Sequence, residues 1–250
     1  MAPEYCLGAT NTPPVVALHG FTQNRRCWGP FADLVSRDHR WNPLDLPGHG
    51  LRSNDRRSFD DLSDELVEAT ADGVLLGYSM GGRVALHVAL HPRQRLKGLV
   101  LMSTTAGIDN EQLREKRRHS DAQLGERLKM IGLEPFLNEW SALPLFVGTP
   151  RENLCTPQRL TNDPQGLIHA LLDLGTGVQA ALWDRLDTLG VPTLIIVGEH
   201  DEHYRQLGSR LHADIAGSTL VTIANASHAP HLCQPERTAQ AVVDWIRTEK

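Results

Sequence analysis

The stretch that most constrains the fold of this chain is one in which a strand pattern runs directly into a helical pattern. Residues 74–76 are apolar and strand-like, and a helical pattern begins at Gly82, so only a tight turn fits between them. Such a turn crowds the backbone on both sides of Ser79, which explains the small residues Gly77 and Gly81. A strand that leads at once into a helix indicates a domain in which the two kinds of element alternate.

Strand and helix patterns alternate along most of the sequence. Helical patterns cover residues 59–69 and 82–90, and a last amphipathic helix starts at Pro235. Alternation of this kind predicts a mostly parallel sheet flanked by helices on both faces. The strands are expected at residues 15–19, 40–45, 74–76, 97–103, 193–197 and 219–223.

The pattern changes in the middle of the chain. No strand-like run occurs between residues 105 and 187, while the charged, leucine-spaced stretches 111–130 and 166–174 predict short helices. The sequence therefore predicts a core formed by residues 1–104 and 188–250, with residues 105–187 inserted as a helical cap.

Composition excludes several classes of protein. The 250 residues are 40% hydrophobic and 22% charged, as in a folded globule, and a net charge of -5 argues against a nucleic-acid-binding surface. The first ten residues lack an export signal, and no run approaches the roughly 18 apolar residues of a membrane span. Four scattered cysteines fit a reducing compartment. We expect a cytoplasmic protein without a membrane partner.

Ser79 is the candidate nucleophile, because the strained turn exposes its hydroxyl and the following helix N-terminus favours negative charge. A serine hydroxyl needs a histidine base, and in this architecture an acid and then the histidine follow the serine in sequence. Asp201 follows the strand 193–197, and His228 follows the strand 219–223. We therefore predict a catalytic triad of Ser79, Asp201 and His228.

Other residues compete for these two roles. Glu199 and Glu202 are rival acids, and His200, His203 and His231 are rival bases. A metal site that pairs His200 and His203 with His228 and His231 would also fit the spacing, although no carboxylate ligands can be placed beside it. Their position after the strands favours Asp201 and His228, and we expect neither a metal ion nor an organic cofactor.

The first predicted strand ends at His19 and runs into a glycine turn at Gly20 and Phe21. Backbone N–H groups at this place and just after the nucleophile can stabilise an oxyanion, so Phe21 and Met80 are the candidate donors. His19 either faces the ligand or fixes the loop by hydrogen bonding.

With these residues the chain resembles the α/β-hydrolase superfamily along its whole length, through His19-Gly20, residues 45–50, the turn at Ser79, and the late Asp and His. More closely, it resembles the α/β-hydrolase-fold lyases of menaquinone biosynthesis that form 2-succinyl-6-hydroxy-2,4-cyclohexadiene-1-carboxylate. The stretches that carry this likeness are residues 77–83, 114–118 with 120–121, 139–140 with 144–146, and Arg159 ahead of 175–177 and 182–183. The resemblance implies that the triad removes a ring proton and pyruvate is eliminated.

The same resemblance implies that arginines bind a substrate with three carboxylates. It assigns this role to Arg83, to Arg117 with Arg118 as an ambiguous neighbour, and to Arg159, and Tyr78 and Trp140 could line the site. By its position alone, Arg83 stands one helical turn after Ser79, where a guanidinium can reach a bound carboxylate.

Three functions remain open at this stage. A lyase acting on a small anionic molecule needs cations near Ser79, which Arg83 supplies. A serine hydrolase acting on esters or carbon–carbon bonds would use the same triad with an apolar pocket. A ligand-binding protein without catalysis would ordinarily have lost a triad residue, and all three are present. The sequence leaves the oligomeric state open.

Overall fold

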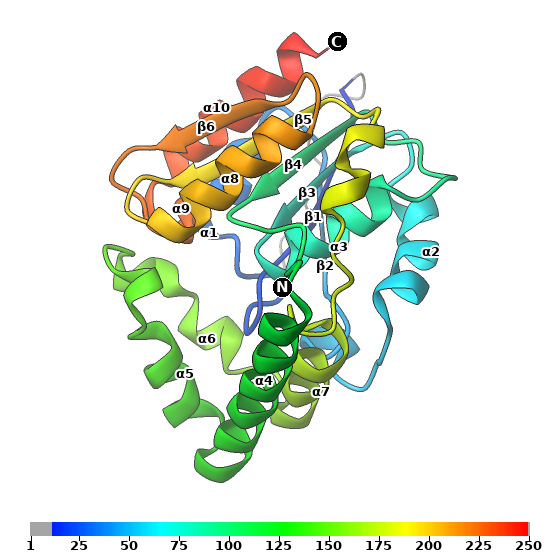
Figure 1. Ribbon diagram of the computed structural model, residues 1–250. Coiled ribbons are helices and arrows are strands. Elements are labelled where there is room, and N and C mark those ends of the chain that lie inside the picture. Colours follow the sequence, from blue (N-terminus) through cyan, green and yellow to red (C-terminus); the bar gives the residue numbers. More distant parts are fainter. Residues whose placement is uncertain (1–11, 250) are drawn as a thin grey trace.

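A computed structural model describes residues 12–249 of the chain. Its centre is a six-stranded sheet in the order β2-β1-β3-β4-β5-β6, and all five strand pairings are parallel (Figure 1). The predicted strands are thus confirmed, with small changes in their ends. The strands are β1 (Val15–Leu18), β2 (Trp41–Leu44), β3 (Val74–Tyr78), β4 (Gly98–Met102), β5 (Thr193–Gly198) and β6 (Thr219–Ile223).

Helices cover both faces of the sheet, because alternate residues of each strand point to opposite sides. On one side, Leu75 belongs to the apolar core shared with α2, α3 and α8. On the other, Leu76 belongs to the core shared with α1, α9 and α10. These helices are α1 (Gly29–Val35), α2 (Phe59–Ala69), α3 (Met80–Ala89), α8 (Glu202–Asp214), α9 (Pro230–Cys233) and α10 (Pro235–Thr248), and η1 (Gly50–Arg52) is a short 3-10 turn.

Local signals set several helix boundaries. Ser58 accepts a hydrogen bond from the Asp61 N–H while the Asp61 side chain accepts one from the Ser58 N–H, a capping box that starts α2. Helix α3 begins at Met80, two positions earlier than predicted, because Ser79 is its N-cap and the turn occupies one residue only.

The stretch between β4 and β5 is helical. Residues 103–192, all of them described, contain no strand, and their α-helices lie together at the carboxyl end of the sheet (Figure 1). The division of the chain into a core and a cap stays a prediction. The elements are α4 (Glu111–Ile131), α5 (Leu133–Ser141), η2 (Pro144–Phe146), η3 (Arg151–Leu154), α6 (Thr156–Arg159), α7 (Pro164–Leu174) and η4 (Trp183–Thr188).

The strand order changes direction at β1. The chain goes from β1 to β2 on one side and then returns to β3 on the other, so the two connections leave the sheet in opposite directions. In open parallel sheets, ligands bind outside the carboxyl ends of the strands at such a point. The residues after β1 and β3 are His19 and Ser79, which lie at this place.

Residues 12–249 include no helix that is long and apolar enough to cross a membrane. Within the same range, Cys27, Cys155 and Cys233 are free and buried. Cys6 and the first ten residues, for which we predicted no export signal, lie outside the described part of the chain.

Candidate active site

Ser79 occupies a strained turn between β3 and α3. Its φ of 51° lies in the left-handed region, which costs free energy for any residue but glycine. The flanking glycines are required by close contacts: a Cβ on Gly77 would lie 2.4 Å from the Gly81 carbonyl oxygen, and one on Gly81 would lie 2.0 Å from that of Leu18. The surrounding backbone therefore fixes the turn in which Ser79 stands.

His228 joins Ser79 to Asp201. Its Nε2 lies 3.2 Å from Ser79 Oγ and its Nδ1 lies 2.8 Å from Asp201 Oδ2. Asp201 is also the N-cap of α8, where Oδ1 accepts a hydrogen bond from the Tyr204 N–H. Burial raises the pKa of Asp201, but the hydrogen bond and charge of His228 outweigh it and hold that pKa below its usual range. Asp201 therefore stays ionised and can orient the imidazole.

None of the rival acids and bases is hydrogen-bonded to Ser79 or His228 in the described part of the chain. Glu199 accepts a hydrogen bond from a loop N–H, Glu202 pairs with side chains of its own helix, and His200 and His203 are exposed. His231 is fully buried, and neither of its ring nitrogens has a hydrogen-bond partner in the described structure. Within residues 12–249 no three His, Cys, Asp or Glu side chains gather to hold a metal ion.

Two backbone N–H groups are free beside Ser79. Over residues 12–249, the N–H of Phe21 and that of Met80 have no hydrogen-bond partner. Met80 is the first residue of α3, and the first N–H groups of a helix have no partner within it. These two groups can donate to an oxyanion that forms near Ser79.

His19 is fully buried at the end of β1, and both ring nitrogens contact the backbone. Its Nδ1 lies 2.9 Å from the Gly20 carbonyl oxygen, and its Nε2 accepts a hydrogen bond from the Leu46 N–H at 3.1 Å. Burial lowers its pKa to about 4, so the ring is neutral near pH 7. This is the loop-fixing arrangement, and it leaves no ring nitrogen for a ligand.

Arg83 is buried on the inner part of α3 and is only 6% exposed. Its Nη1 donates to the Leu174 carbonyl oxygen at 2.6 Å, and the guanidinium lies 5.7 Å from the centroid of the Phe59 ring. Burial lowers its pKa to about 10. No carboxylate of the described residues forms an ion pair with it, so the direct contacts of this buried charge are with neutral groups.

Arg159 is a second buried guanidinium without a carboxylate partner in the part of the chain described. It is 1% exposed, and its Nε donates to the Leu154 carbonyl oxygen at 2.8 Å. Its Nη1 donates to the Thr22 hydroxyl, and the group lies 5.9 Å from the Phe146 ring centroid. Thr22 belongs to the loop after β1, so Arg159 connects α6 to the loop that carries Phe21.

The neighbouring arginines of α4 differ in their partners. Arg117 Nε donates to Asp121 Oδ1 at 2.8 Å, and Asp121 is buried. Arg118 pairs instead with the exposed glutamates Glu111 and Glu115 on the same helix. The ambiguity between the two is therefore reduced, because only Arg117 is anchored to the interior.

The two predicted aromatic residues pack beside the triad. The Tyr78 ring lies 5.5 Å from the ring of His228, and burial raises the pKa of its hydroxyl. Trp140, on α5, packs edge-on against Phe21 with the ring centroids 5.2 Å apart. Tyr78 thus contacts a triad residue directly, and Trp140 contacts a residue whose N–H is a candidate oxyanion donor.

Sequence reasoning missed the contact between Tyr204 and the imidazole of His228, whose ring centroids are 4.3 Å apart. The signal was present, because Tyr204 stands three positions after Asp201, in the first turn of α8.

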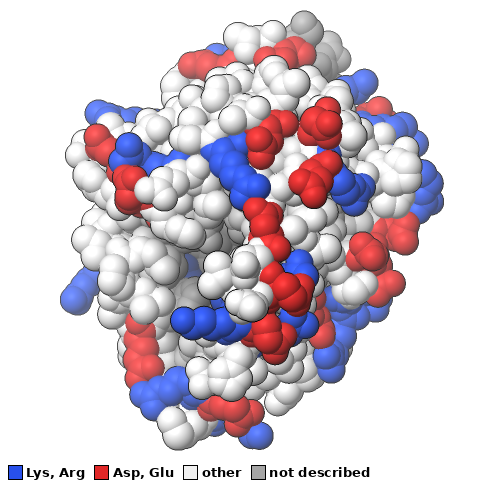
Figure 2. Space-filling model, in the orientation of Figure 1, with Lys and Arg blue, Asp and Glu red and all other residues white. Residues whose placement is uncertain are grey.

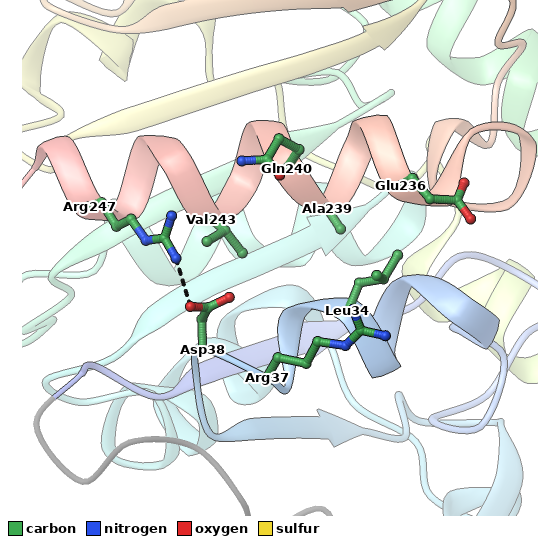
Figure 3. Close-up of a pocket in the computed structure, with 8 residues that line it drawn as sticks. All are labelled: Leu34, Arg37, Asp38, Glu236, Ala239, Gln240, Val243 and Arg247. Atoms are coloured by element: carbon green, nitrogen blue, oxygen red, sulfur yellow. Dashed lines mark hydrogen bonds and ion pairs between the residues drawn. The ribbon is translucent and has the colours of Figure 1, made fainter.

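Two hollows of the surface lie between different sets of helices. Figure 2 shows a hollow between the region of α8 and the helices α4 and α5, with a basic side chain at its rim and charges of both signs around it. A second hollow lies between α1 and α10 (Figure 3), where Arg247 pairs with Asp38 at 2.7 Å. This second hollow has none of the predicted site residues in its lining.

Proteins similar in sequence and structure match nearly the whole chain. The model of the alpha/beta hydrolase family matches residues 15–241. A Bacillus subtilis (strain 168) protein provisionally named 2-succinyl-6-hydroxy-2,4-cyclohexadiene-1-carboxylate synthase is 33% identical, over 96% of this chain and 92% of its own. The synthase of that name from Salmonella typhimurium (strain LT2) is 30% identical, over 98% of each. MenH from S. aureus superposes with a TM-score of 0.90 at 31% identity, over 97% of this chain and 96% of that one. The expected fold class is confirmed.

Proposed function

The chain belongs to the α/β hydrolase family, and we propose that it is a lyase of menaquinone biosynthesis. Its substrate would be 2-succinyl-5-enolpyruvyl-6-hydroxy-3-cyclohexene-1-carboxylate, and its products 2-succinyl-6-hydroxy-2,4-cyclohexadiene-1-carboxylate and pyruvate. The relatives that match nearly the whole chain bear the name of this synthase. We further propose that the protein acts in the cytoplasm on this small anionic molecule, with no metal ion or cofactor.

The observation that carries the proposal is the pair of buried guanidiniums that lack carboxylate partners among the described residues. A charge buried away from water is costly unless an opposite charge pairs with it. Arg83 stands one helical turn after Ser79, and Arg159 is bonded to the loop that carries Phe21. A substrate with several carboxylates supplies the missing partners, whereas a neutral ester does not.

The reaction removes one proton and one leaving group from the ring. The proton at ring carbon 2 is acidic because that carbon is next to the succinyl carbonyl. In the proposed step, His228 takes the proton of the Ser79 hydroxyl, and Ser79 Oγ takes the ring proton. The ring double bond then shifts to give the 2,4-diene as the carbon–oxygen bond at carbon 5 breaks. Pyruvate leaves as its enolate, whose methylene carbon takes up the proton held by His228 to give pyruvate, and Ser79 keeps the ring proton as its restored hydroxyl.

Negative charge collects on the succinyl carbonyl oxygen while the proton leaves. The free N–H groups of Phe21 and Met80 are the proposed donors to this oxygen, so they stabilise the enolate as they would stabilise the oxyanion of an ester. Asp201 keeps the imidazole in the orientation that accepts the serine proton. The same constellation can therefore serve an elimination without an acyl-enzyme.

The arginines would bind the carboxylates and hold the ring over Ser79. Arg83 and Arg159 are already fixed by carbonyl and hydroxyl oxygens, so little side-chain freedom is lost when the substrate binds. Arg117, whose Nε donates a hydrogen bond to Asp121, adds a third cation. Tyr78 and Trp140 would enclose the ring from the sides.

The experiment that tests this function follows the ultraviolet absorbance of the diene and the release of pyruvate when purified protein is mixed with the enolpyruvyl substrate. We expect equal amounts of the two products. Reaction of Ser79 with an organophosphonate tests separately whether the hydroxyl is activated. Labelling without diene formation would favour a serine hydrolase, and the absence of both would favour a binding protein.

A further inference from the structure

We propose that Asp121 is a positioning residue that holds Arg117 in the orientation needed to bind a substrate carboxylate. This inference rests on the proposed function and deepens it. Asp121 itself would not touch the substrate.

The contact between the two residues leaves the binding edge of the guanidinium free. Asp121 Oδ1 accepts a hydrogen bond from Arg117 Nε at 2.8 Å, one helical turn apart on α4. No other nitrogen of Arg117 has a hydrogen-bond partner in the described structure. A guanidinium has five N–H donors, and the four on its two Nη nitrogens can bind a carboxylate with two parallel hydrogen bonds.

The burial of Asp121 is unusual for a carboxylate in a helix salt bridge. Its side chain is 5% exposed, against 46% for Arg117, and Oδ2 has no hydrogen-bond partner among residues 12–249. A buried carboxylate oxygen without a partner costs free energy. Arg118 and Glu115 form a similar bond at 2.9 Å on the same helix without this cost, since both are exposed. Helix stability alone therefore does not account for Asp121.

The end of α7 connects this pair to Arg83. The Leu174 carbonyl oxygen accepts the hydrogen bond from Arg83, and the next residue, Gly175, makes room for Asp121, since a Cβ there would lie 2.7 Å from Oδ2. Burial lowers the pKa of Arg83, Arg117 lowers it further, and Asp121 opposes them. The carboxylate is therefore near enough to both cations to offset part of the repulsion between them.

The test is a double-mutant cycle with Asp121→Ala, Arg117→Ala and both together, assayed on the enolpyruvyl substrate. We expect Asp121→Ala to raise KM about tenfold while kcat changes less than about threefold, because binding and not chemistry is affected. In the Arg117→Ala background the same change should add less than about twofold, because there is then no guanidinium to position. Asp121→Asn, whose amide oxygen can still accept from Nε, should lose less.

Glu115→Ala is the matched control, because it breaks the exposed Arg118–Glu115 pair of the same helix and should leave KM unchanged. Additive losses in the cycle, or an equal loss with Glu115→Ala, would overturn the role of Asp121. The cycle is repeated as Kd for the same compound in a Ser79→Ala background. If Asp121 and Arg117 are coupled in Kd but wild type forms no diene, the positioning role of Asp121 is retained and the proposed reaction is overturned. Diene formation with additive losses would do the reverse, and the absence of both binding and turnover would overturn both.

Discussion

Replacing Arg83 by alanine is the sharpest test of the difference between a lyase and a hydrolase. The guanidinium is 6% exposed, and its hydrogen bond goes to a neutral carbonyl oxygen. Removing it takes away a cation close to Ser79 and leaves the triad in place. The effect should therefore depend on whether the substrate carries a carboxylate.

The magnitude follows from the burial of the charge. Burial lowers the pKa of Arg83 from its ordinary value to about 10. This corresponds to about 3 kcal/mol of unfavourable desolvation. A carboxylate that pairs with the guanidinium can recover a comparable amount. We therefore expect Arg83→Ala to cost about 2 to 4 kcal/mol of transition-state stabilisation, which is about thirty- to a thousandfold in kcat/KM.

The assay measures kcat/KM of wild type and Arg83→Ala on two substrates, the enolpyruvyl compound and a short-chain aryl ester. If the protein hydrolyses the ester, that activity uses only the triad and the N–H donors, so its loss should be much smaller. Arg83→Lys should recover only part of the lyase activity, because an ammonium cannot form two parallel hydrogen bonds with a carboxylate. Arg37→Ala, in the hollow between α1 and α10 (Figure 3), is the matched arginine control and should change neither activity.

Two outcomes would refute this reasoning. Equal losses on both substrates would show that Arg83 supports the fold, and a loss on the ester alone would show that it shapes an acyl pocket. In either case the hydrolase would become the better assignment.

The remaining predictions concern the triad, the buried histidines and metal ions. Ser79→Ala and His228→Ala should each lower turnover at least about a thousandfold, and Asp201→Asn somewhat less; most activity retained in either alanine variant would disprove the triad. Burial lowers the pKa of His19 to about 4 and that of His49 to about 3, so below pH 6.5 the unfolded chain binds more protons than the folded one. The stability that depends on keeping these histidines neutral should be fully present above pH 6.5. As the pH drops towards 4, the free energy of unfolding should fall by up to about 1.4 kcal/mol per pH unit for each histidine. Denaturation midpoints that stay constant between pH 7 and 5 would contradict this. A chelator should leave activity unchanged, and loss restored by zinc would reopen the metal site.

The architecture was predictable because its signals are local. Each strand is a short apolar run bounded by turn residues, and its alternation with helical patterns predicts a mostly parallel sheet. The order of the strands was not predicted and comes from the structure. The positions of Asp201 and His228 after their strands could be identified for the same reason. The early start of α3 could not, because it depends on the conformation of the single residue Ser79.

Residue roles that depend on tertiary contacts were harder to predict from the sequence. The sequence left two roles open for His19, and only the backbone groups of Gly20 and Leu46 around its ring nitrogens favour the loop-fixing one. The Tyr204 ring contacts His228 because Asp201, the partner of His228, is also the N-cap of α8, and Tyr204 lies in the first turn of that helix. Residue spacing places Tyr204 close to Asp201, but it does not show that the tyrosine ring contacts His228, which comes from another part of the chain.

The basic run on α4 shows what the sequence alone cannot predict about a site. By composition, Arg117 and Arg118 are equivalent members of a solvated helix face, and each has an acidic side chain within one helical turn. What separates them is the glycine at position 175, on a different helix end, which lets Asp121 enter the interior while Glu115 stays in water. A carboxylate in water binds its arginine weakly and exchanges with solvent, whereas one in the interior holds it in one orientation. The functional difference that we propose between these two adjacent arginines therefore rests on the burial of their partners.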